Sequence, residues 1–438
     1  MSVKIVLIGA GSASFGYNAL GDIFASDVLA GSTIMLHDIN PDTLKTVEGF
    51  ASQFVEQEGL PFTIQATTNR KEALQGADFC IISIEIGNRY ELWEMDWKIP
   101  LQYGIRQVYG ENGGPGGMFH ALRIIPPILA ICADIQAICP EAYVINLSNP
   151  MIRISHAVHT KFPDLRFIGL CHEVHSLVRH LPVLLDTPFK ELEIKAGGLN
   201  HFSILVEASY KASGEDAYPD IRAKGSEYFA TAPSYFGNAG ERDLFLQILK
   251  RFDYLPITTD SHFGEYIHWA ADVVDHQGIL DFYHNYKHAM LQPEAPPMQR
   301  LEEGTRQRGD WHMITIIDGI VGDSGHTELA VNIPNDDLIP YLPANQMVEV
   351  PAVIDKHGVH GVKLEHYPQA FAGLLLNQCA VNDMTTDAIL SKSKHKVMQA
   401  LLLDPVVDKV QATEDMLDTI LALQSPYLDY LQQAIESM

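Results

Sequence analysis

The chain has 438 residues, of which 55 are Asp or Glu and 30 are Lys or Arg, so its formal net charge is −25. This acidic balance would repel a polyphosphate backbone, and no basic run with interleaved aromatic residues occurs, so we exclude nucleic acid as a partner. Its 47% hydrophobic content is enough to bury one large core or two ordinary ones. No segment reaches the roughly 18 uninterrupted apolar residues of a membrane span, so we expect no membrane partner.

The five cysteines are odd in number and lack the regular spacing of a disulfide framework. The N-terminus shows no basic region followed by an apolar stretch and a small-residue cleavage site. We therefore expect a reducing, cytoplasmic location.

Short apolar runs alternate with amphipathic stretches in the first half of the chain. This alternation is the βαβ signature of a parallel sheet that is covered by helices on both faces. We predict buried strands at residues 4–8, 33–36, 79–84, 143–147 and 166–170. The sequence therefore predicts a doubly wound, Rossmann-type domain over residues 1–190.

The pattern changes at about residue 191. Strand candidates at 191–195 and 203–208 are followed by longer helical segments and loops. We expect an α+β domain over residues 191–438 that serves substrate binding and oligomerisation. Because no low-complexity linker separates the halves, we expect them to share an interface.

A glycine-rich turn follows the first predicted strand, with Gly9, Gly11 and Gly16 in the spacing GxGxxxxG. Glycines alone are weak evidence, because any tight strand-to-helix turn can use them. Here a strand precedes the turn, a helix can follow it, and Asp38 ends the second strand, where a carboxylate accepts hydrogen bonds from ribose hydroxyls. The context predicts a dinucleotide site, and Asp38 favours NAD because it would repel a 2′-phosphate.

Cys171 and His201 offer a thiol and an imidazole as a metal pair. A thiolate and a neutral imidazole form half of a divalent-metal shell and leave positions for water or substrate hydroxyls. A separation of thirty residues is no ligand motif, however, and each residue taken alone is better explained as structural.

Segments along nearly the whole chain resemble glycoside hydrolase family 4. They are VKIVLIGAGSASF at 3–15, Asn149-Pro150, CHEV at 171–174, GLNHF at 198–202, LPITTDSHFGEY at 255–266, VNIPN at 331–335 and ALLLDPVV at 400–407. Gly11-Ser12 and Asp38 also follow the family's cofactor pattern. Members of this family are NAD- and manganese-dependent glycosidases related in fold to lactate and malate dehydrogenases, and relatives form dimers or tetramers. The resemblance therefore implies a sugar glycosidase that uses NAD and Mn²⁺ and forms a homodimer or homotetramer.

The chemistry implied by the resemblance is a redox-assisted elimination. Hydride passes from carbon 3 of the sugar to NAD, and the resulting ketone acidifies the hydrogen on carbon 2. A base removes that proton, the metal stabilises the enediolate, and the glycosidic oxygen leaves carbon 1. Water then adds and the hydride returns, so the net reaction is hydrolysis.

The resemblance places Cys171 and His201 on the family's manganese ligands and Asn149 on a substrate contact. His172 takes the place of the acid that protonates the leaving oxygen, and an imidazole suits this role because its ordinary pKa is near neutrality. The plain alternative for His172 is a histidine that hydrogen-bonds a neighbour.

The base at carbon 2 is predicted to be Asp260, with Tyr266 and Glu265 as alternatives, because some relatives use a tyrosine and others an aspartate in the loop at 255–266. Glu111 matches an acidic position that tunes the base in some relatives. A loop carboxylate beside a Gly/Pro cluster is otherwise typical of a flexible turn.

The segment CHEV disfavours phosphorylated sugars, because phosphosugar-cleaving members tend to carry Asn or Asp after the cysteine. Together with GPGG at 114–117, it looks most like the α-galacturonidase branch, so we predict an α-galacturonide substrate. That branch has an arginine where this chain has Ser261, and arginine is the side chain best shaped to hold a sugar carboxylate. A neutral α-glucoside or α-galactoside remains the alternative.

Two further classes stay open. A NAD-dependent 2-hydroxy-acid dehydrogenase would share the fold and Asn149-Pro150, with Arg89 as its only arguable substrate-binding arginine, and would release net NADH. A non-catalytic NAD-sensing protein would bind the cofactor without metal dependence or turnover.

Overall fold

The computed structural model describes residues 2–11, 15–171, 173–232, 242–291, 299, 301–302 and 313–431. Two of the predicted site residues, Ser12 and His172, lie outside the described residues.

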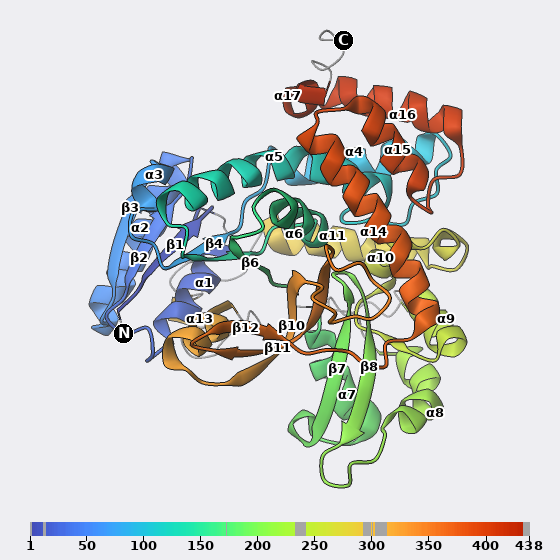
Figure 1. Cartoon of the computed structure of the whole chain (residues 1–438), viewed down its shortest axis with the longest axis horizontal. Coiled ribbons are helices and arrows are strands. Elements are labelled where there is room, and N and C mark those ends of the chain that lie inside the picture. The colour runs from blue at the N-terminus through green and yellow to red at the C-terminus, as the bar shows by residue number, and fades with distance from the viewer. Residues whose placement is uncertain are drawn as a thin grey trace.

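Six parallel strands form one half of a mixed sheet, in the order β3-β2-β1-β4-β5-β6 (Figure 1). They are β1 (Lys4–Ile8), β2 (Thr33–His37), β3 (Thr63–Thr67), β4 (Phe79–Ile82), β5 (Tyr143–Asn146) and β6 (Arg166–Gly169). The order reverses between β1 and β4, as in doubly wound dinucleotide-binding domains. The predicted Rossmann-type sheet is confirmed.

The strand β3 was not among the strands predicted from the sequence. This strand lies at the edge of the sheet and pairs only with β2 there, and none of its five residues is fully buried. A short strand with polar residues at alternate positions lacks the continuous apolar run that marks the central strands.

Seven helices accompany this half of the chain: α1 (Phe15–Phe24), α2 (Pro41–Glu58), α3 (Arg70–Ala73), α4 (Arg89–Gln102), α5 (Gly114–Ile138), α6 (Met151–Lys161) and α7 (His175–Leu185). Among the described residues, α5 is the one helix that is long and apolar enough to cross a membrane by length and composition. It packs against α4, α6 and α14 (Gln369–Leu390), and it buries His120 and Arg123. This packing is typical of a core helix.

The second half of the chain extends the same sheet with antiparallel strands, in the order β10-β11-β7-β8-β9. These are β7 (Leu192–Leu199), β8 (Phe202–Tyr210), β9 (Leu255–Pro256), β10 (His326–Pro334) and β11 (Met347–Asp355), and β12 (Gly358–Gly361) pairs with β11. β10 joins β6 at Asn332 opposite Gly169. The sheet thus continues across the predicted boundary at residue 190, and the division into 1–190 and 191–438 stays a prediction.

The remaining helices surround these strands and the parallel half (Figure 1). They are α8 (Tyr218–Phe229), α9 (Asp243–Phe252), α10 (Asp260–Phe263), α11 (His276–Leu291), α13 (Met313–Gly322), α15 (Lys394–Leu403), α16 (Val410–Leu423) and α17 (Ser425–Leu428), with single turns η1 (Phe189–Glu191), η2 (Gly264–Tyr266), η3 (Ala270–Asp272) and η4 (Asp429–Leu431). The largest hydrophobic cluster runs from Ile5 in β1 to Phe371 in α14, so the two halves share one core.

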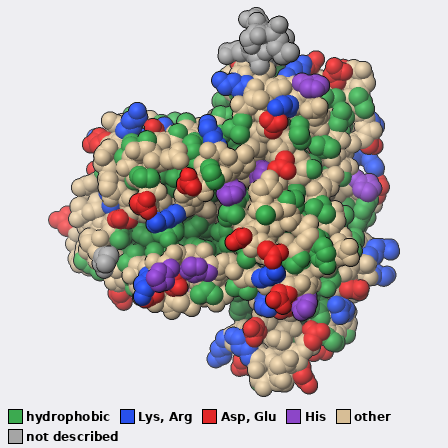
Figure 2. Space-filling model, viewed as in Figure 1, with side chains coloured by type: hydrophobic (Ala, Val, Ile, Leu, Met, Phe, Trp, Pro, Cys, Tyr) green, Lys and Arg blue, Asp and Glu red, His purple; other side chains and the backbone are tan. Residues whose placement is uncertain are grey.

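Acidic and basic side chains are interspersed on the face of the molecule that Figure 2 shows. Lys and Arg form no single large patch on that face.

Candidate active site

The glycine turn after β1 allows close approach of three backbone segments. Gly9 has φ of 89°, and a Cβ built on it would lie 2.0 Å from the carbonyl oxygen of Ser83 beyond β4. A Cβ on Gly16 would lie 2.3 Å from the carbonyl oxygen of Ala10, so this glycine lets α1 begin against the turn. Both positions therefore require glycine for steric reasons.

Asp38 is tied directly to this turn. The Gly11 N–H donates to Oδ2 of Asp38 at 2.8 Å, and the Asn40 N–H donates to Oδ1 at 2.9 Å. A carboxylate has about four acceptor positions, so two bonds leave capacity for ribose hydroxyls. The contacts orient Asp38 beside the glycines as a dinucleotide site requires, and the cofactor roles stay predictions.

Cys171 follows β6 and Asn149 follows β5, while the glycine turn follows β1. Because the carboxyl ends of parallel strands meet at one edge of a sheet, these three features share that edge. Asn149 is half-buried and forms a cis peptide bond with Pro150. Its predicted contact with substrate stays a prediction.

The predicted metal pair is brought together by the tertiary structure. His201 occupies the tight turn between β7 and β8 with φ of 66°, and its Nε2 lies 3.4 Å from Sγ of Cys171. A carboxylate completes the group, because Oε1 of Glu173 lies 3.5 Å from the same Nε2. The three donor atoms lie within 4.8 Å of one another, and the side chains of Glu173 and His201 are 7% and 3% exposed. Sulfur, imidazole and carboxylate ligands fit a divalent transition metal.

Burial governs the charges of this cluster. It raises the pKa of the Cys171 thiol, and the charges of Glu173 and Glu349 raise it further. It also raises the pKa of Glu173, against the opposing hydrogen bond from Thr258. A bound cation favours the ionised forms of both groups, so this environment suits residues that exchange protons for a metal.

Glu349 of β11 anchors the turn that carries His201. Its carboxylate accepts bonds from Asn200 Nδ2 at 2.7 Å, Ser203 Oγ at 2.9 Å and Asn332 Nδ2 at 3.2 Å. Asn200 and Ser203 flank the β7–β8 turn, and Asn332 lies in β10. Glu349 was not predicted from the sequence, because its hydrogen-bond partners come from segments far apart in the chain.

Tyr266 and Glu265 lie on a short turn beside this cluster. Both oxygens of Glu265 accept backbone N–H bonds from residues 111–113. The ring of Tyr266 stacks on Phe202 at 5.0 Å, and its buried hydroxyl has no hydrogen-bond partner among the described residues. Glu265 therefore holds the loop at Glu111, while the Tyr266 hydroxyl is free to meet another group.

A chain of contacts connects Glu111 to the metal pair. Oε1 of Glu111 pairs with Nη2 of Arg89 at 2.5 Å, and Oε2 lies 3.7 Å from Nδ1 of His262. The rings of His262 and His201 lie 4.5 Å apart between centroids. Glu111 is thus placed near the cluster, and its predicted tuning of the base stays a prediction.

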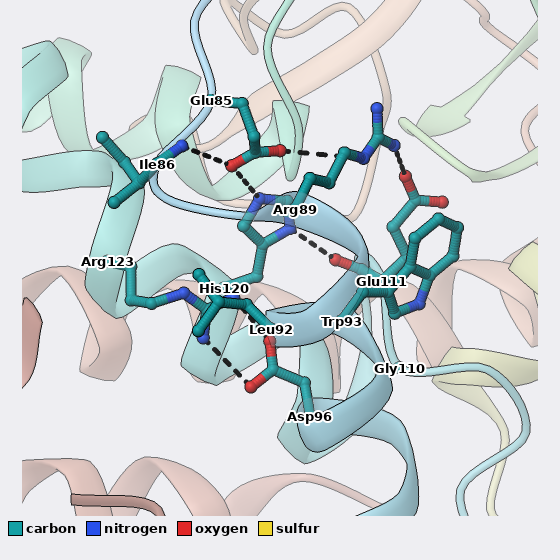
Figure 3. A pocket seen from close by; sticks show the side chains of 10 residues that line it. All are labelled: Glu85, Ile86, Arg89, Leu92, Trp93, Asp96, Gly110, Glu111, His120 and Arg123. Carbon is teal, nitrogen blue, oxygen red and sulfur yellow. Dashed lines mark hydrogen bonds and ion pairs between the residues drawn. The ribbon is translucent and has the colours of Figure 1, made fainter. Parts of the chain in front are cut away.

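A small pocket opens beside Glu111, where Glu85, Arg89 and His120 point toward one another (Figure 3). Nε of Arg89 lies 3.7 Å from Oε2 of Glu85, and Nε2 of His120 lies 3.3 Å from Oε1. Burial would raise the pKa of Glu85, but His120 and Arg89 lower it to about 2. Arg89 is therefore held between two carboxylates.

Asp260 faces a helix terminus. Its two oxygens accept the backbone N–H groups of Leu244 and Phe245 at 2.8 Å each, which caps the first turn of α9. The side chain is fully buried, and burial raises its pKa to about 7. These contacts show that Asp260 holds the N-terminus of α9, and its predicted role as the base at carbon 2 stays a prediction.

Comparison with known proteins identifies the family. Residues 4–186 match the model of family 4 glycosyl hydrolases, and residues 196–407 match the model of the family 4 glycosyl hydrolase C-terminal domain. The chain belongs to glycoside hydrolase family 4. An α-glucosidase of Erwinia rhapontici is 50% identical to this family 4 hydrolase over 99% of the chain and 100% of the relative.

The expected likeness to the α-galacturonidase branch is corrected by these comparisons. An α-galacturonidase of Bacillus subtilis (strain 168) is 26% identical over 96% of this chain and 98% of its own. The α-glucosidase shares about twice that fraction of residues. The likeness to this α-glucosidase is therefore greater than the likeness to this α-galacturonidase.

Solved structures agree with the fold of this family 4 hydrolase. A 6-phospho-α-glucosidase from gut microorganisms, in complex with NAD and Mn²⁺, has a TM-score of 0.79 at 19% identity and covers 97% of this chain and 98% of its own. Malate dehydrogenase from Plasmodium falciparum has a TM-score of 0.52 at 14% identity over 92% of this chain and 100% of its own. The second likeness confirms the predicted dehydrogenase-like architecture.

Proposed function

We propose that this family 4 hydrolase cleaves a neutral α-glucoside with the help of NAD and a divalent cation such as Mn²⁺. The observation that carries the proposal is the cluster of Cys171, Glu173 and His201, which lies at the same edge of the sheet as the glycine turn. The 50% identity to an α-glucosidase supports the choice of sugar.

Cys171 and His201 would hold the cation, and the turn at Gly9 and Gly11 with Asp38 would hold NAD. When bound, the cofactor accepts hydride from carbon 3 of the sugar, and the cation supplies Lewis acidity for the adjacent oxygens. Asn149 follows β5 at the same edge and would contact the sugar. Ser12 and His172, which lie outside the described residues, would bind the cofactor and protonate the leaving oxygen, respectively.

Tyr266 is our choice for the base at carbon 2. Its hydroxyl is buried without a partner among the described residues, whereas both Asp260 oxygens are engaged by α9. Burial raises the pKa of Tyr266, and the charge of Arg153 opposes that rise. A cation held next to this phenol would favour its ionised form, which is the form that accepts a proton.

The charges around the site support a neutral sugar. Arg89, which lines the neighbouring pocket, is already paired with Glu111 and Glu85. A sugar carboxylate would have to displace these partners, and it would meet the buried carboxyl groups of Glu173 and Glu265 nearby. An uncharged glucoside neither has to displace the carboxylates paired with Arg89 nor is repelled by the buried carboxyl groups.

Hydrolysis of a panel of nitrophenyl α-glucoside, α-galactoside and α-galacturonide, with NAD and Mn²⁺ supplied, tests the proposal. We expect the glucoside to be cleaved with the highest kcat/KM, without net NADH, and only when both additions are present. Undiminished turnover after chelation and cofactor removal would reject the mechanism. Preference for the galacturonide would reject the choice of sugar alone.

We also propose a reducing, cytoplasmic location, because all five cysteines are free thiols. The expected homodimer or homotetramer stays a prediction, and the elution volume of the full chain on size-exclusion chromatography tests it.

A further inference from the structure

Glu173 has a geometry that an ordinary ion pair with His201 does not require. One oxygen, Oε1, accepts a hydrogen bond from Oγ1 of Thr258 at 2.6 Å. The other, Oε2, is buried and has no hydrogen-bond partner among the described residues. A buried carboxylate oxygen without a partner is costly, so it points to a ligand that supplies the missing interaction.

The separations between donor atoms match those of ligands around one cation. Metal–ligand bonds of about 2.0 to 2.3 Å at angles of about 90 to 120° place neighbouring donors roughly 2.8 to 4.0 Å apart. The sulfur of Cys171 and Oε1 of Glu173 lie 3.4 and 3.5 Å from Nε2 of His201. Oε1 therefore stands in the same relation to the imidazole as the thiol sulfur does, and Oε2 of the same carboxylate is the oxygen that has no hydrogen-bond partner among the described residues.

We propose that the Glu173 carboxylate is a third protein ligand of the divalent cation, beside Cys171 and His201. This inference rests on the metal-dependent part of the proposed function. The remaining positions of the cation are left to water and to the hydroxyls of the sugar.

Charge supports this assignment. An ionised Cys171 and a neutral His201 leave a divalent cation with a net charge of +1 in a buried site. The Glu173 carboxylate brings the net charge of the centre to zero, which reduces the desolvation cost of burying the ion. The hydroxyl of Thr258 donates a hydrogen bond to the Glu173 carboxylate, and such bonds commonly orient the ligands of a metal.

Glu349 provides a matched comparison. It is also a buried carboxyl group whose charge acts on Cys171, but its oxygens already accept bonds from Asn200, Ser203 and Asn332. Removing the charge of Glu349 alters the electrostatics of the site without removing a donor from the cluster. Comparing Glu173→Gln with Glu349→Gln therefore distinguishes the loss of a metal ligand from the loss of a nearby negative charge.

The test measures metal binding by the metal-free full-length protein. Mn²⁺ is titrated while the EPR signal of free Mn²⁺ is followed, and Co²⁺ is added in parallel to record its visible absorption. We expect Glu173→Gln to weaken Mn²⁺ binding by about 10-fold or more and to change the Co²⁺ ligand-field bands. We expect Glu349→Gln to keep the wild-type Co²⁺ spectrum, and Thr258→Val to weaken binding less than Glu173→Gln does.

Wild-type Mn²⁺ affinity in Glu173→Gln would overturn the inference. So would equal weakening in both glutamine variants with an unchanged Co²⁺ spectrum. Circular dichroism and thermal melts of the metal-free variants establish that they are folded. Substitution of an exposed glutamate, Glu58→Gln, controls for the titration itself. If Cys171→Ala and His201→Ala also bind Mn²⁺ like the wild type, the metal-dependent function itself fails. If Glu173→Gln is the only one of these variants that binds Mn²⁺ like the wild type, the assignment of Glu173 as third ligand is refuted and the metal site itself stands.

Discussion

The sulfur of Cys171 lies 3.4 Å from Nε2 of His201, although 30 residues separate them in the chain. Cys171 follows the last parallel strand, and His201 sits in the turn of an antiparallel hairpin. The two strand systems are joined through β10 and β11, so the approach depends on the whole sheet.

Replacing Cys171 or His201 by Ala is expected to weaken Mn²⁺ binding by at least about 10- to 100-fold and to abolish glycoside hydrolysis, because each change removes a donor atom. Mn²⁺ titration and a nitrophenyl α-glucoside assay measure the two effects. Cys132→Ala is the control, since this buried thiol of α5 lies outside the cluster, and it should retain activity. Unchanged Mn²⁺ affinity in Cys171→Ala would contradict the metal site.

Tyr266→Phe keeps the ring that stacks on Phe202 but removes the hydroxyl. We expect kcat to fall by about 10²- to 10⁴-fold with KM little changed, because the proton acceptor is lost. Mass spectrometry of sugar produced in deuterated water should show deuterium at carbon 2 for the wild type. Tyr210→Phe, which loses a bond to Asp220 near the surface, is the control. Full activity in Tyr266→Phe would show that another residue is the base at carbon 2.

Asp260→Asn tests the structural role of this carboxyl group. Burial raises its folded pKa to about 7 from a usual 3.8, so its contribution to stability is complete below pH 3.8 and is lost as the pH rises through about 7. The stability of the wild type relative to Asp260→Asn should therefore decline between pH 4 and pH 8. Denaturant unfolding of both proteins at several pH values measures this difference, and a pH-independent difference would oppose it. Activity should fall less than about 10-fold if Asp260 only caps α9.

Glu111→Gln removes the charge closest to the Arg89 guanidinium. The freed arginine is expected to improve the kcat/KM for an α-galacturonide relative to an α-glucoside by on the order of 10-fold. The measurement is the ratio of the two kcat/KM values, because the activities on both the α-galacturonide and the α-glucoside are expected to decrease. Glu94→Gln, whose partners are Lys98 and Lys287, should leave the ratio unchanged. An unaltered ratio in Glu111→Gln would show that Arg89 does not influence sugar choice.

Gly11→Ala places a methyl group 2.8 Å from Oδ2 of Asp38 and 2.5 Å from Oγ1 of Thr43. The turn must shift to accept it, so we expect NAD affinity to fall by about 10-fold or more. Fluorescence titration with NADH measures the loss. Gly49→Ala in α2 is the matched control, because its Cβ would meet nothing within 4 Å. It should bind the cofactor normally and gain up to about 1 kcal/mol of stability.

The parallel half of the fold could be predicted because its central strands are buried on both faces. Ile5 to Ile8 and Phe79 to Ile82 therefore read as continuous apolar runs. The edge strand at residues 63–67 carries no such signal. The sequence also did not predict that both halves join into one sheet, because β10 and β6 are connected through a single residue pair, Asn332 with Gly169.

Some residues of the candidate site could likewise be predicted from the sequence, and others could not. Cys171 and His201 were found through the family resemblance, and Glu173 stood in the same CHEV segment without being recognised as a neighbour of His201. The contact of Asp260 with α9 was not foreseen, because a loop carboxylate looks the same in sequence whether it faces a substrate or the N-terminus of a helix. The direction of a side chain depends on packing between distant elements.

The sequence by itself determined the doubly wound sheet, the glycine turn with its carboxylate, and the family. These features depend on local periodicity, on steric limits within a few residues, and on motifs that keep their order along the chain. Only the tertiary structure decided that Glu173 lies beside His201, that Arg89 is held between two carboxylates, and that Asp260 caps a helix. Apart from the local pair of Glu85 and Arg89, these contacts join residues that are far apart in the chain, and the packing of strands and helices sets the distances between them.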